Sequence, residues 1–385
     1  MADYTSFNLE QYVRGLDGHL PEFPFSFAEW EEKATTLMST SLLHYVAGGS
    51  GDQHTQTNNV EAFHHWGMTP RMLAAATERD LSIELFGMKL PTPLFMAPIG
   101  VTGIIDRDND GERACARAAA ATGVPFCAST LTQVPMEKIP GSLGETPGFF
   151  QLYTPSDKQL AESFISRAEA AGFKALVVTL DTWMPGYRPR DLVRSNFPQL
   201  RGWCLANYFS DQRFLDILGQ DPDKDVRATA RAFASVFGKS LGWEDLGWLR
   251  GTTKLPIVLK GICHPDDAKR AIDAGIDGIY VSNHGGRQAN GGRAAIDMLP
   301  EVAEVCGDTP VLFDSGVRSG VDVVKALALG ATAVGIGRPY SYGLAIGGAA
   351  GVEHVLRCLL AEAEIQMAID GRADIASLRG DIQRI

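Results

Sequence analysis

The chain has 385 residues, of which 45% are hydrophobic and 21% charged, and its formal net charge is −11. These values are typical of a soluble globular protein, and the negative charge argues against nucleic acid or an anionic membrane as the main partner. The six cysteines show no CxxC spacing, so we expect no disulfide framework, no metal site and a reducing cytoplasmic setting. We expect neither a signal-peptide core nor a stretch that approaches a membrane span.

The first 90 or so residues form an extension that precedes the regular part of the chain. We expect a helix around residues 26–39, "SFAEWEEKATTLMS", followed by a loop through residues 45–55, "YVAGGSGDQHT". No low-complexity tract separates this extension from the rest. The whole chain, 1–385, is therefore predicted to form a single domain.

Eight short apolar runs follow, and each ends in glycine, proline or polar residues. Their near-continuous apolarity predicts strands buried on both faces, as in a parallel sheet. The runs occupy residues 94–100, 125–130, 148–153, 175–181, 256–261, 278–283, 310–316 and 333–339.

Helix-like segments that end in glycine lie between several of these runs. They span residues 111–123, 157–172, 265–275 and 319–330, and a terminal glycine is a common helix stop signal. Eight strands alternating with helices is the count of a (β/α)8 TIM barrel. A doubly wound open sheet is the alternative, but it usually has fewer strands and a glycine-rich fingerprint after the first one, which this sequence lacks. We therefore predict the barrel, starting near residue 90.

One connection is much longer than a barrel loop requires. It lies between the fourth and fifth runs, at about residues 188–250, and contains "RPRDLVRSNFPQLRGWCLANYFSDQRF". Long loops in compact domains are often functional covers of a site. We interpret this insertion as an active-site lid.

Polar side chains gather at the carboxyl ends of the eight runs, where barrel enzymes build their active sites. Each alone has a structural explanation, such as a helix cap for Ser129 or Asp181 and a solvent-edge position for Lys260. Together they bring a base, an acid and three cations to one mouth, which indicates a site. In chain order these residues are Pro98, Ser129, Gln151, Tyr153, Thr179, Asp181, Lys260, Ser282, His284, Arg287, Asp314, Gly337 and Arg338.

Two glycine-containing turns with an arginine follow the seventh and eighth runs. They read "DSGVRSG" from residue 314 and "GIGRP" from residue 335. This is the usual place in a barrel for a phosphate held by backbone N–H groups and a helix N-terminus. Walker A, GxGxxG and HExxH motifs do not occur. The two turns predict a phosphorylated small-molecule ligand.

Several of these motifs together resemble the FMN-dependent 2-hydroxy-acid oxidising family. They are "SNHGGRQ", "DSGVRSG", "GIGRP", "LTQVPMEKIP", "FFQLY" and "TLDT". The resemblance covers nearly the whole chain and is greatest to the lactate 2-monooxygenase branch, through "YVAGGSGDQHT", "DTWMPGYRPRD" and the long lid. It implies a (β/α)8 barrel that carries FMN.

The resemblance also implies catalytic and substrate-binding roles. His284 would be the base, and Asp181 would stabilise the imidazolium that forms. Arg188 and Arg287 would grip the substrate carboxylate through their planar guanidinium groups. Tyr45 and Tyr153 would hold the carboxylate and the hydroxyl group, although the sequence alone leaves Tyr45 as an ordinary tyrosine in an apolar stretch.

The resemblance assigns the remaining residues to FMN. Lys260 would lie beside the part of the ring that becomes negative on reduction. Hydrogen-bonding partners of the ring would be Ser129, Gln151, Thr179 and Ser282, with Pro98, Ile99 and Gly100 along it. The ribityl and phosphate contacts would be Asp314, Gly316, Arg318, Gly337 and Arg338.

Four departures from the family pattern bear on the substrate. Leu131 replaces an aromatic residue and "YRPRD" replaces a more basic run, and both touch the substrate side of the site. Thr154 stands where the lactate monooxygenase branch has a tyrosine, and "MPGY" precedes Arg188 in place of "IFGW". We expect an L-2-hydroxy acid, with L-lactate first, to be oxidised with O2 as a lactate 2-monooxygenase, giving acetate, CO2 and water. The alternative is an oxidase that releases the 2-keto acid and hydrogen peroxide.

Two readings from other classes remain at this point, a phosphate-binding isomerase without flavin and a flavoprotein without turnover. The isomerase leaves His284, Arg287 and Lys260 unexplained, and the inert flavoprotein leaves the base and both carboxylate-binding arginines unexplained. The family also implies a homotetramer or homo-octamer.

Overall fold

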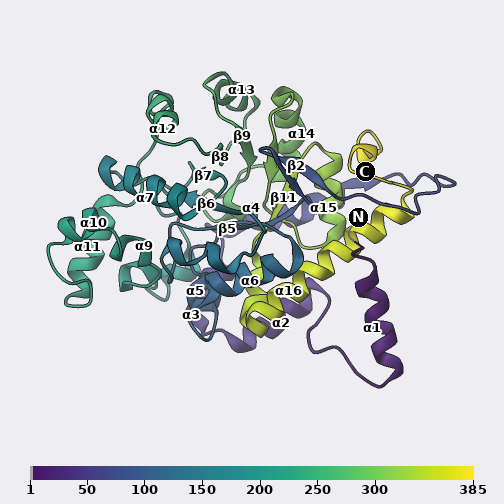
Figure 1. Ribbon diagram of the computed structural model, residues 1–385, viewed down its shortest axis with the longest axis horizontal. Helices are drawn as coiled ribbons and strands as arrows, with labels where there is room; N and C mark the ends of the chain where they lie inside the picture. Colours follow the sequence, from purple (N-terminus) through teal and green to yellow (C-terminus); the bar gives the residue numbers. More distant parts are fainter. Residues whose placement is uncertain (1–2) are drawn as a thin grey trace.

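The computed structural model describes residues 3–385 and is built around a closed barrel of eight parallel strands (Figure 1). The hydrogen-bonded order around the barrel is β4-β5-β6-β7-β8-β9-β10-β11. The strands are β4 (Leu94–Met96), β5 (Phe126–Ala128), β6 (Gly148–Leu152), β7 (Leu176–Thr179), β8 (Ile257–Lys260), β9 (Gly278–Val281), β10 (Val311–Phe313) and β11 (Ala333–Ile336). Each predicted run contains one barrel strand, so the (β/α)8 prediction is confirmed.

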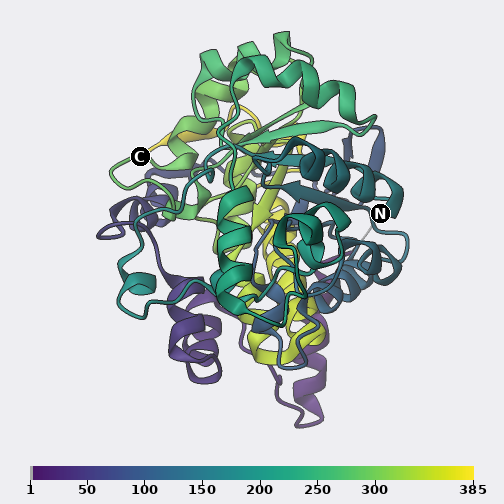
Figure 2. The ribbon, with the colours of Figure 1, turned by 90° about the vertical axis from the view of Figure 1, so that its left-hand side faces the viewer.

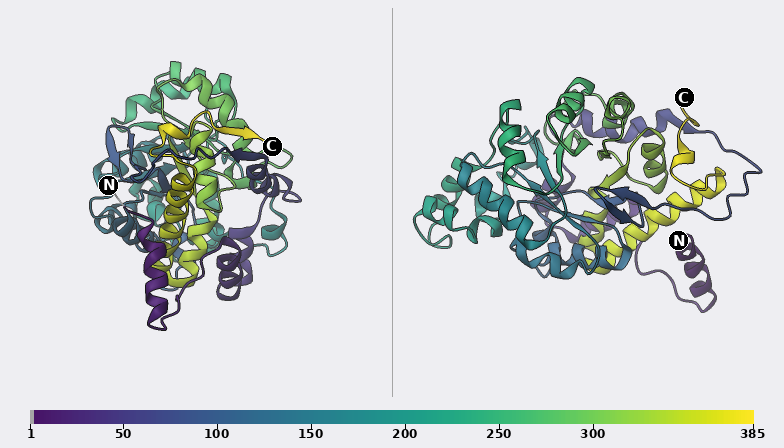
Figure 3. Two further views of the ribbon diagram at one scale, coloured as in Figure 1. Left: turned by 90° about the vertical axis from the view of Figure 1, so that its right-hand side faces the viewer. Right: turned by 45° about the horizontal axis from the view of Figure 1, so that its top comes forward.

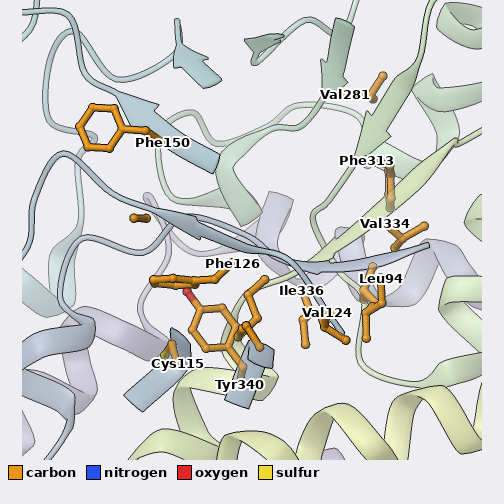
Figure 4. Close-up of a cluster of buried hydrophobic side chains, with 14 of the residues drawn as sticks. Leu94, Cys115, Val124, Phe126, Phe150, Val281, Phe313, Val334, Ile336 and Tyr340 are labelled. Carbon is orange, nitrogen blue, oxygen red and sulfur yellow. The ribbon is translucent and has the colours of Figure 1, made fainter. Parts of the chain in front are cut away.

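Alternation along the strands builds two apolar layers. Phe95 and Cys127 point into the barrel, where they join an inner cluster with Phe149, Val177 and Tyr280. The neighbouring residues point outward and pack against the surrounding helices. Figure 4 shows this outer layer, with side chains that include Leu94, Phe126, Phe150, Phe313, Val334, Ile336 and the helix residues Cys115 and Tyr340. Both faces of the strands are therefore buried, as their continuous apolarity predicts.

The four helices predicted between strands are present and end where their glycines indicate. They are α6 (Gly111–Thr122), α7 (Lys158–Ala171), α13 (Pro265–Asp273) and α15 (Gly320–Ala328). Gly123 and Gly172 follow α6 and α7 in the left-handed conformation, which glycine adopts without a Cβ clash. Further elements around the barrel are α5 (Thr102–Ile105), η2 (Met136–Lys138), η3 (Pro140–Ser142), α12 (Leu246–Thr252), η6 (His284–Gly286), α14 (Ala295–Cys306) and α16 (Arg338–Ile369).

The N-terminal extension is helical and also closes the bottom of the barrel. It contains α1 (Ser6–Leu16), α2 (Phe27–Leu37), α3 (Thr40–Ala47), α4 (His54–Glu61) and η1 (Ala62–His65). The predicted helix at 26–39 is confirmed as α2, but the predicted loop is shorter, because α3 continues through Ala47 and α4 begins at His54. The hairpin of β2 (Ile83–Leu85) and β3 (Met88–Leu90) contributes Leu85 and Leu90 to the inner barrel cluster.

The C-terminal end of the chain returns to the N-terminal extension. Here β1 (Trp66–Met68) pairs with β12 (Ile382–Arg384), and η7 (Ala376–Leu378) precedes β12.

The insertion between β7 and β8 is a chain of short helices rather than an open loop. It contains α8 (Pro189–Leu192), η4 (Pro198–Arg201), α9 (Ala206–Phe209), α10 (Gln212–Leu218), α11 (Val226–Val236) and η5 (Trp243–Asp245). Figure 2 shows this segment in front of the barrel. The predicted lid at about 188–250 lies within this connection; because α12 begins at Leu246, we use residues 183–245 as the lid from here on.

One helix, α16, is long and apolar enough to cross a membrane by length and composition. This differs from the sequence expectation, which found no stretch of that kind. The helix packs against α6, α15 and α2, and 56% of its most apolar window is buried. Gly347 and Gly348 have non-helical backbone angles and divide it into two parts. These features are those of a buried core helix.

Candidate active site

A cavity lies at the carboxyl ends of the barrel strands. Its lining joins charged groups, aromatic rings and glycine turns, the mixture expected of a ligand site. The predicted site residues that line it are Tyr45, Pro98, Ile99, Gly100, Tyr153, Arg188, Lys260, His284, Arg287, Asp314, Gly316, Arg318, Gly337 and Arg338. The structure places the others behind this lining; they are Ser129, Gln151, Thr179, Asp181 and Ser282.

The segment "HGG" after β9 makes a sharp left-handed turn that presents His284 to the cavity. Three consecutive residues have positive φ: 58° at His284, 62° at Gly285 and 72° at Gly286. A Cβ on Gly286 would lie 2.5 Å from the backbone nitrogen of Gln56, so only glycine fits there. The turn is fixed by hydrogen bonds from His284 N to Ser282 Oγ (3.1 Å) and from Gly285 N to Ser315 Oγ (2.9 Å).

His284 forms a pair with Asp181, which follows β7. The distance between His284 Nδ1 and Asp181 Oδ1 is 2.9 Å, and Thr182 Oγ1 lies 3.1 Å from the same ring nitrogen. Burial alone would raise the pKa of Asp181, but the charges of His284 and Lys260 outweigh it and hold the pKa at about 2. Burial lowers the pKa of His284 although the carboxylate opposes this. A neutral imidazole backed by a carboxylate can accept a proton near neutral pH.

Two arginines, the buried Arg188 and the half-buried Arg287, flank the ring of Tyr45. The guanidinium carbons of Arg287 and Arg188 lie 5.1 and 5.8 Å from the ring centroid. Arg287 Nη1 donates to the carbonyl groups of Tyr45 and Gly48, and Arg188 Nη2 donates to Gln288 Oε1 (2.6 Å). Burial and the nearby charge of Arg188 lower the pKa of Arg287 to about 9, which leaves it a cation at neutral pH. The two cations make this part of the cavity suited to a carboxylate.

Tyr153 lies on the lid side of the cavity and packs against Phe237 of the lid, with ring centroids 5.5 Å apart. Its backbone nitrogen donates to Thr130 Oγ1 at 2.9 Å. Burial raises the pKa of its hydroxyl group, which therefore stays protonated and can donate a hydrogen bond. Leu131, Phe197 and Phe237 give the adjacent lining an apolar character.

A buried ammonium group is held at the ends of β8, β9 and β10. Lys260 Nζ donates to Ser282 Oγ at 2.8 Å and lies 3.7 Å from Asp314 Oδ2. Asp314 accepts further hydrogen bonds from Tyr280 (2.8 Å), Ser315 (2.8 Å) and Ser282. The lysine is thereby fixed at the cavity wall, where it can stabilise a developing negative charge.

Side chains at the ends of β5, β6 and β7 form a chain of hydrogen bonds behind the cavity wall. Gln151 Oε1 accepts from Ser129 Oγ (3.0 Å), and Gln151 Nε2 donates to Thr179 Oγ1 (3.0 Å). The three side chains belong to neighbouring strands, and all are buried. Pro98 to Gly100 line the cavity beside them.

The far end of the cavity has the features of a phosphate site. Gly316 has a φ of 99°, and a Cβ there would lie 2.0 Å from the carbonyl oxygen of Asn59. Arg318 and Arg338 line this end, and burial lowers the pKa of Arg338 to about 10. The α16 helix begins at Arg338 and directs its N-terminus toward the same region. Two cations, backbone N–H groups and a helix N-terminus suit a phosphate.

Four residues that sequence reasoning missed support the site. Thr182 contacts both members of the His–Asp pair. Gln288 accepts from Arg188 and donates to the carbonyl oxygen of Asp181 (2.8 Å). Gln56 donates to the carbonyl oxygen of Ala47 (3.0 Å) and accepts from Arg338. Gln199 of the lid donates to the carbonyl oxygen of Gly100 (3.1 Å). Thr182 and Gln288 belong to the motifs "TLDT" and "SNHGGRQ", Gln56 directly follows "YVAGGSGDQHT" and Gln199 lies in the lid segment, but no spacing in the sequence indicates their contacts.

The geometry defines a barrel enzyme that binds a phosphate-bearing cofactor beside a small carboxylic acid. The FMN-dependent dehydrogenase family matches residues 34–384 of the chain. An L-lactate oxidase of Lysinibacillus sphaericus (strain C3-41) is 41% identical over 359 residues, which cover 93% of this chain and 92% of the relative.

Two solved structures have the same fold over almost their whole length. A lactate oxidase of Pediococcus acidilactici has a TM-score of 0.84 at 36% identity, covering 94% of this chain and 95% of that chain. A mandelate oxidase with (S)-4-hydroxymandelic acid has a TM-score of 0.84 at 35% identity, covering 94% and 99%.

The chain therefore belongs to the FMN-dependent dehydrogenase family. It is an FMN-dependent oxidoreductase of the kind that oxidises 2-hydroxy acids, as the sequence motifs predicted. The site fits the cofactor: the phosphate end has its two arginines and the glycine turn at Gly316, and Lys260 stands at the wall.

Proposed function

We propose that the enzyme oxidises an L-2-hydroxy acid, with L-lactate as the first candidate, and uses O2 to give the 2-keto acid and hydrogen peroxide. The observation that carries the proposal is the convergence of the His284–Asp181 pair with Arg188 and Arg287 on one cavity. The names of the similar lactate oxidases support this oxidase outcome over the monooxygenase outcome expected from the sequence.

In this proposal each polar residue of the cavity has a role toward the substrate. Arg188 and Arg287 bind the carboxylate, and the Tyr45 and Tyr153 hydroxyl groups orient the substrate. FMN, held by the residues named in the next paragraph, would supply the acceptor for the two electrons and one of the two protons that the substrate loses. His284 takes up a proton, and Asp181 stabilises the resulting imidazolium.

The other residues act on the cofactor in this proposal. Lys260 stabilises the negative charge that accompanies reduction. Ser129, Gln151, Thr179 and Ser282 hydrogen-bond around the ring, and Pro98 to Gly100 lie along it. The ribityl chain and phosphate are held by Asp314, Gly316, Arg318, Gly337 and Arg338.

The second candidate is the lactate 2-monooxygenase reaction, in which keto acid and peroxide react before release and give acetate, CO2 and water. It is favoured by the packing of the lid. Gln199 is fully buried and bonded to the Gly100 carbonyl group, and Phe197 and Phe237 line the cavity. A lid held in this way slows product escape.

The experiment uses the purified yellow enzyme and L-lactate. Anaerobic addition of lactate should bleach the yellow colour, and air with catalase should then give pyruvate without acetate. Mostly acetate would instead establish the monooxygenase. No bleaching with lactate or with longer or aromatic 2-hydroxy acids would overturn the proposed substrate class.

We also propose a cytoplasmic setting. All six cysteines are free thiols, and five of them are buried, as suits a protein folded under reducing conditions.

A further inference from the structure

Helix α1 turns an apolar stripe toward solvent. Leu9, Tyr12, Val13 and Leu16 are 64%, 70%, 51% and 86% exposed. Their spacing of i, i+3, i+4 and i+7 puts them on one side of the helix, opposite Phe7, which is buried. An amphipathic helix normally points such a stripe at its own core, so this face requires a partner. We call these four residues the α1 stripe.

The opposite side of α1 is anchored, so the stripe cannot turn inward. The ring of Phe7 packs against His354 and lies 4.3 Å from the guanidinium carbon of Arg357. Arg357 also pairs with Glu10 at 2.8 Å, and the backbone before α1 donates two hydrogen bonds to Glu364. Figures 1 and 3 show α1 at the periphery of the molecule, beside α16. It also precedes the family match, which begins at residue 34.

The spacing of the stripe is symmetric about a point between Tyr12 and Val13. If two α1 helices cross antiparallel around a two-fold axis at that point, Leu9 meets the Leu16 of the second copy, and Tyr12 meets its Val13. Each apolar side chain then contacts an apolar side chain, as a self-complementary two-fold interface requires. We propose that the α1 stripe is a self-association surface whose partner is α1 of a second copy of this chain.

The charges around the stripe favour a second copy over a membrane. Within α1, Arg14 is the one cation and Glu10 the one acid, and Asp17 follows the helix directly. Interfacial helices on anionic lipids depend on a polar face rich in lysine and arginine, which α1 lacks. Glu10 is already neutralised by Arg357, so the rim of the proposed contact carries little repulsion.

The size of the stripe sets the expected affinity of the two copies for each other. The 11 residues of α1 span about 16 Å, which supplies less than the roughly 800 Å² per partner of a standard stable interface. The pairing is therefore expected to be concentration-dependent, or to join units already held together elsewhere.

A charge-swap experiment tests the pairing directly. One full-length variant carries Leu9→Glu with Leu16→Glu, and a second carries Leu9→Lys with Leu16→Lys. Sedimentation velocity of the FMN-loaded proteins at several concentrations should give a smaller assembly for each variant than for the unmodified enzyme. An equal mixture of the two should regain the larger assembly, because each glutamate then meets a lysine of the second copy.

The other outcomes overturn the proposal in different ways. Unchanged size in both variants means that the stripe does not mediate association. Smaller assemblies that the mixture does not restore mean that the stripe docks on another part of the chain. The control Met72→Glu with Leu73→Glu adds the same charges at exposed loop residues and should leave the size unchanged. Oxidation of the hydroxy acid should stay at the unmodified rate in all variants, because α1 contributes nothing to the cavity lining.

Discussion

The catalytic wall and the lid are built in different ways. On the wall, Lys260 ends one barrel strand, Asp181 and His284 follow its two neighbours, and each is held by partners on the barrel itself. The lid consists of short helical segments, and it exposes large apolar side chains such as Trp183 and Tyr187. The difference suggests a division of labour: the wall determines whether the hydroxy acid is oxidised, and the lid determines how long the keto acid stays. The four changes below test that division.

Replacing the base should have the largest effect. His284→Asn keeps a polar side chain of similar reach but cannot accept the proton, so the anaerobic bleaching rate should fall by about 10²–10⁴-fold. Stopped-flow absorbance measures this rate, and the visible spectrum before mixing confirms that FMN is still bound. A loss of less than about tenfold would show that another group acts as the base.

A change at the junction of wall and lid should affect binding more than chemistry. Arg188→Lys keeps the charge but loses the planar fork and the hydrogen bond to Gln288. Lysine should also lose one hydrogen bond to the substrate carboxylate. A charge-assisted hydrogen bond of this kind contributes about 1.5–3 kcal/mol, so KM for L-lactate should rise roughly 10- to 100-fold. The change in kcat should be much smaller. If kcat falls as much as kcat/KM and KM is unchanged, Arg188 acts mainly in the transition state.

A change confined to the lid should leave reduction intact. Gln199→Leu has a similar volume but removes the hydrogen bond to the Gly100 carbonyl group. One neutral hydrogen bond contributes about 0.5–1.5 kcal/mol, so the inhibition constant of pyruvate should rise roughly 2- to 10-fold. Anaerobic bleaching at saturating lactate should stay within about twofold of the unmodified rate. A large loss of bleaching would show that the lid also positions the substrate, contrary to the division proposed here.

The same contrast explains what the sequence could predict. The eight barrel strands were predictable because a strand buried on both faces must be apolar almost throughout, and the site residues followed at their ends. The supporting glutamines were not, because their partners are distant in the chain. Gln56 contacts Arg338, and Gln199 contacts Gly100, so only the fold brings these segments together. The exposure of the α1 stripe could not be predicted either, because a helix that packs against its own core has the same apolar periodicity.

The smallest effect is expected from Thr182, which lines the cavity and contacts both members of the wall pair. Its hydroxyl group donates to Asp181 Oδ1 at 2.9 Å and so draws negative charge away from His284. The base must be neutral, and burial lowers the pKa of His284 below its ordinary value. Activity should therefore be present at neutral pH and fall as the pH drops through that lowered pKa.

Thr182→Val should move this acid limb of kcat/KM upward, because the carboxylate then favours the imidazolium more strongly. One hydrogen bond of about 1 kcal/mol corresponds to a shift of about 0.7 pH unit. Thr182→Ser, which keeps the hydroxyl group, should leave the limb in place and is the matched control. An unmoved limb in the valine variant would mean that Thr182 only fills space. A limb that moves to lower pH would mean that the hydroxyl group stabilises the imidazolium itself, and that the short contact to Nδ1 matters more than the bond to Asp181.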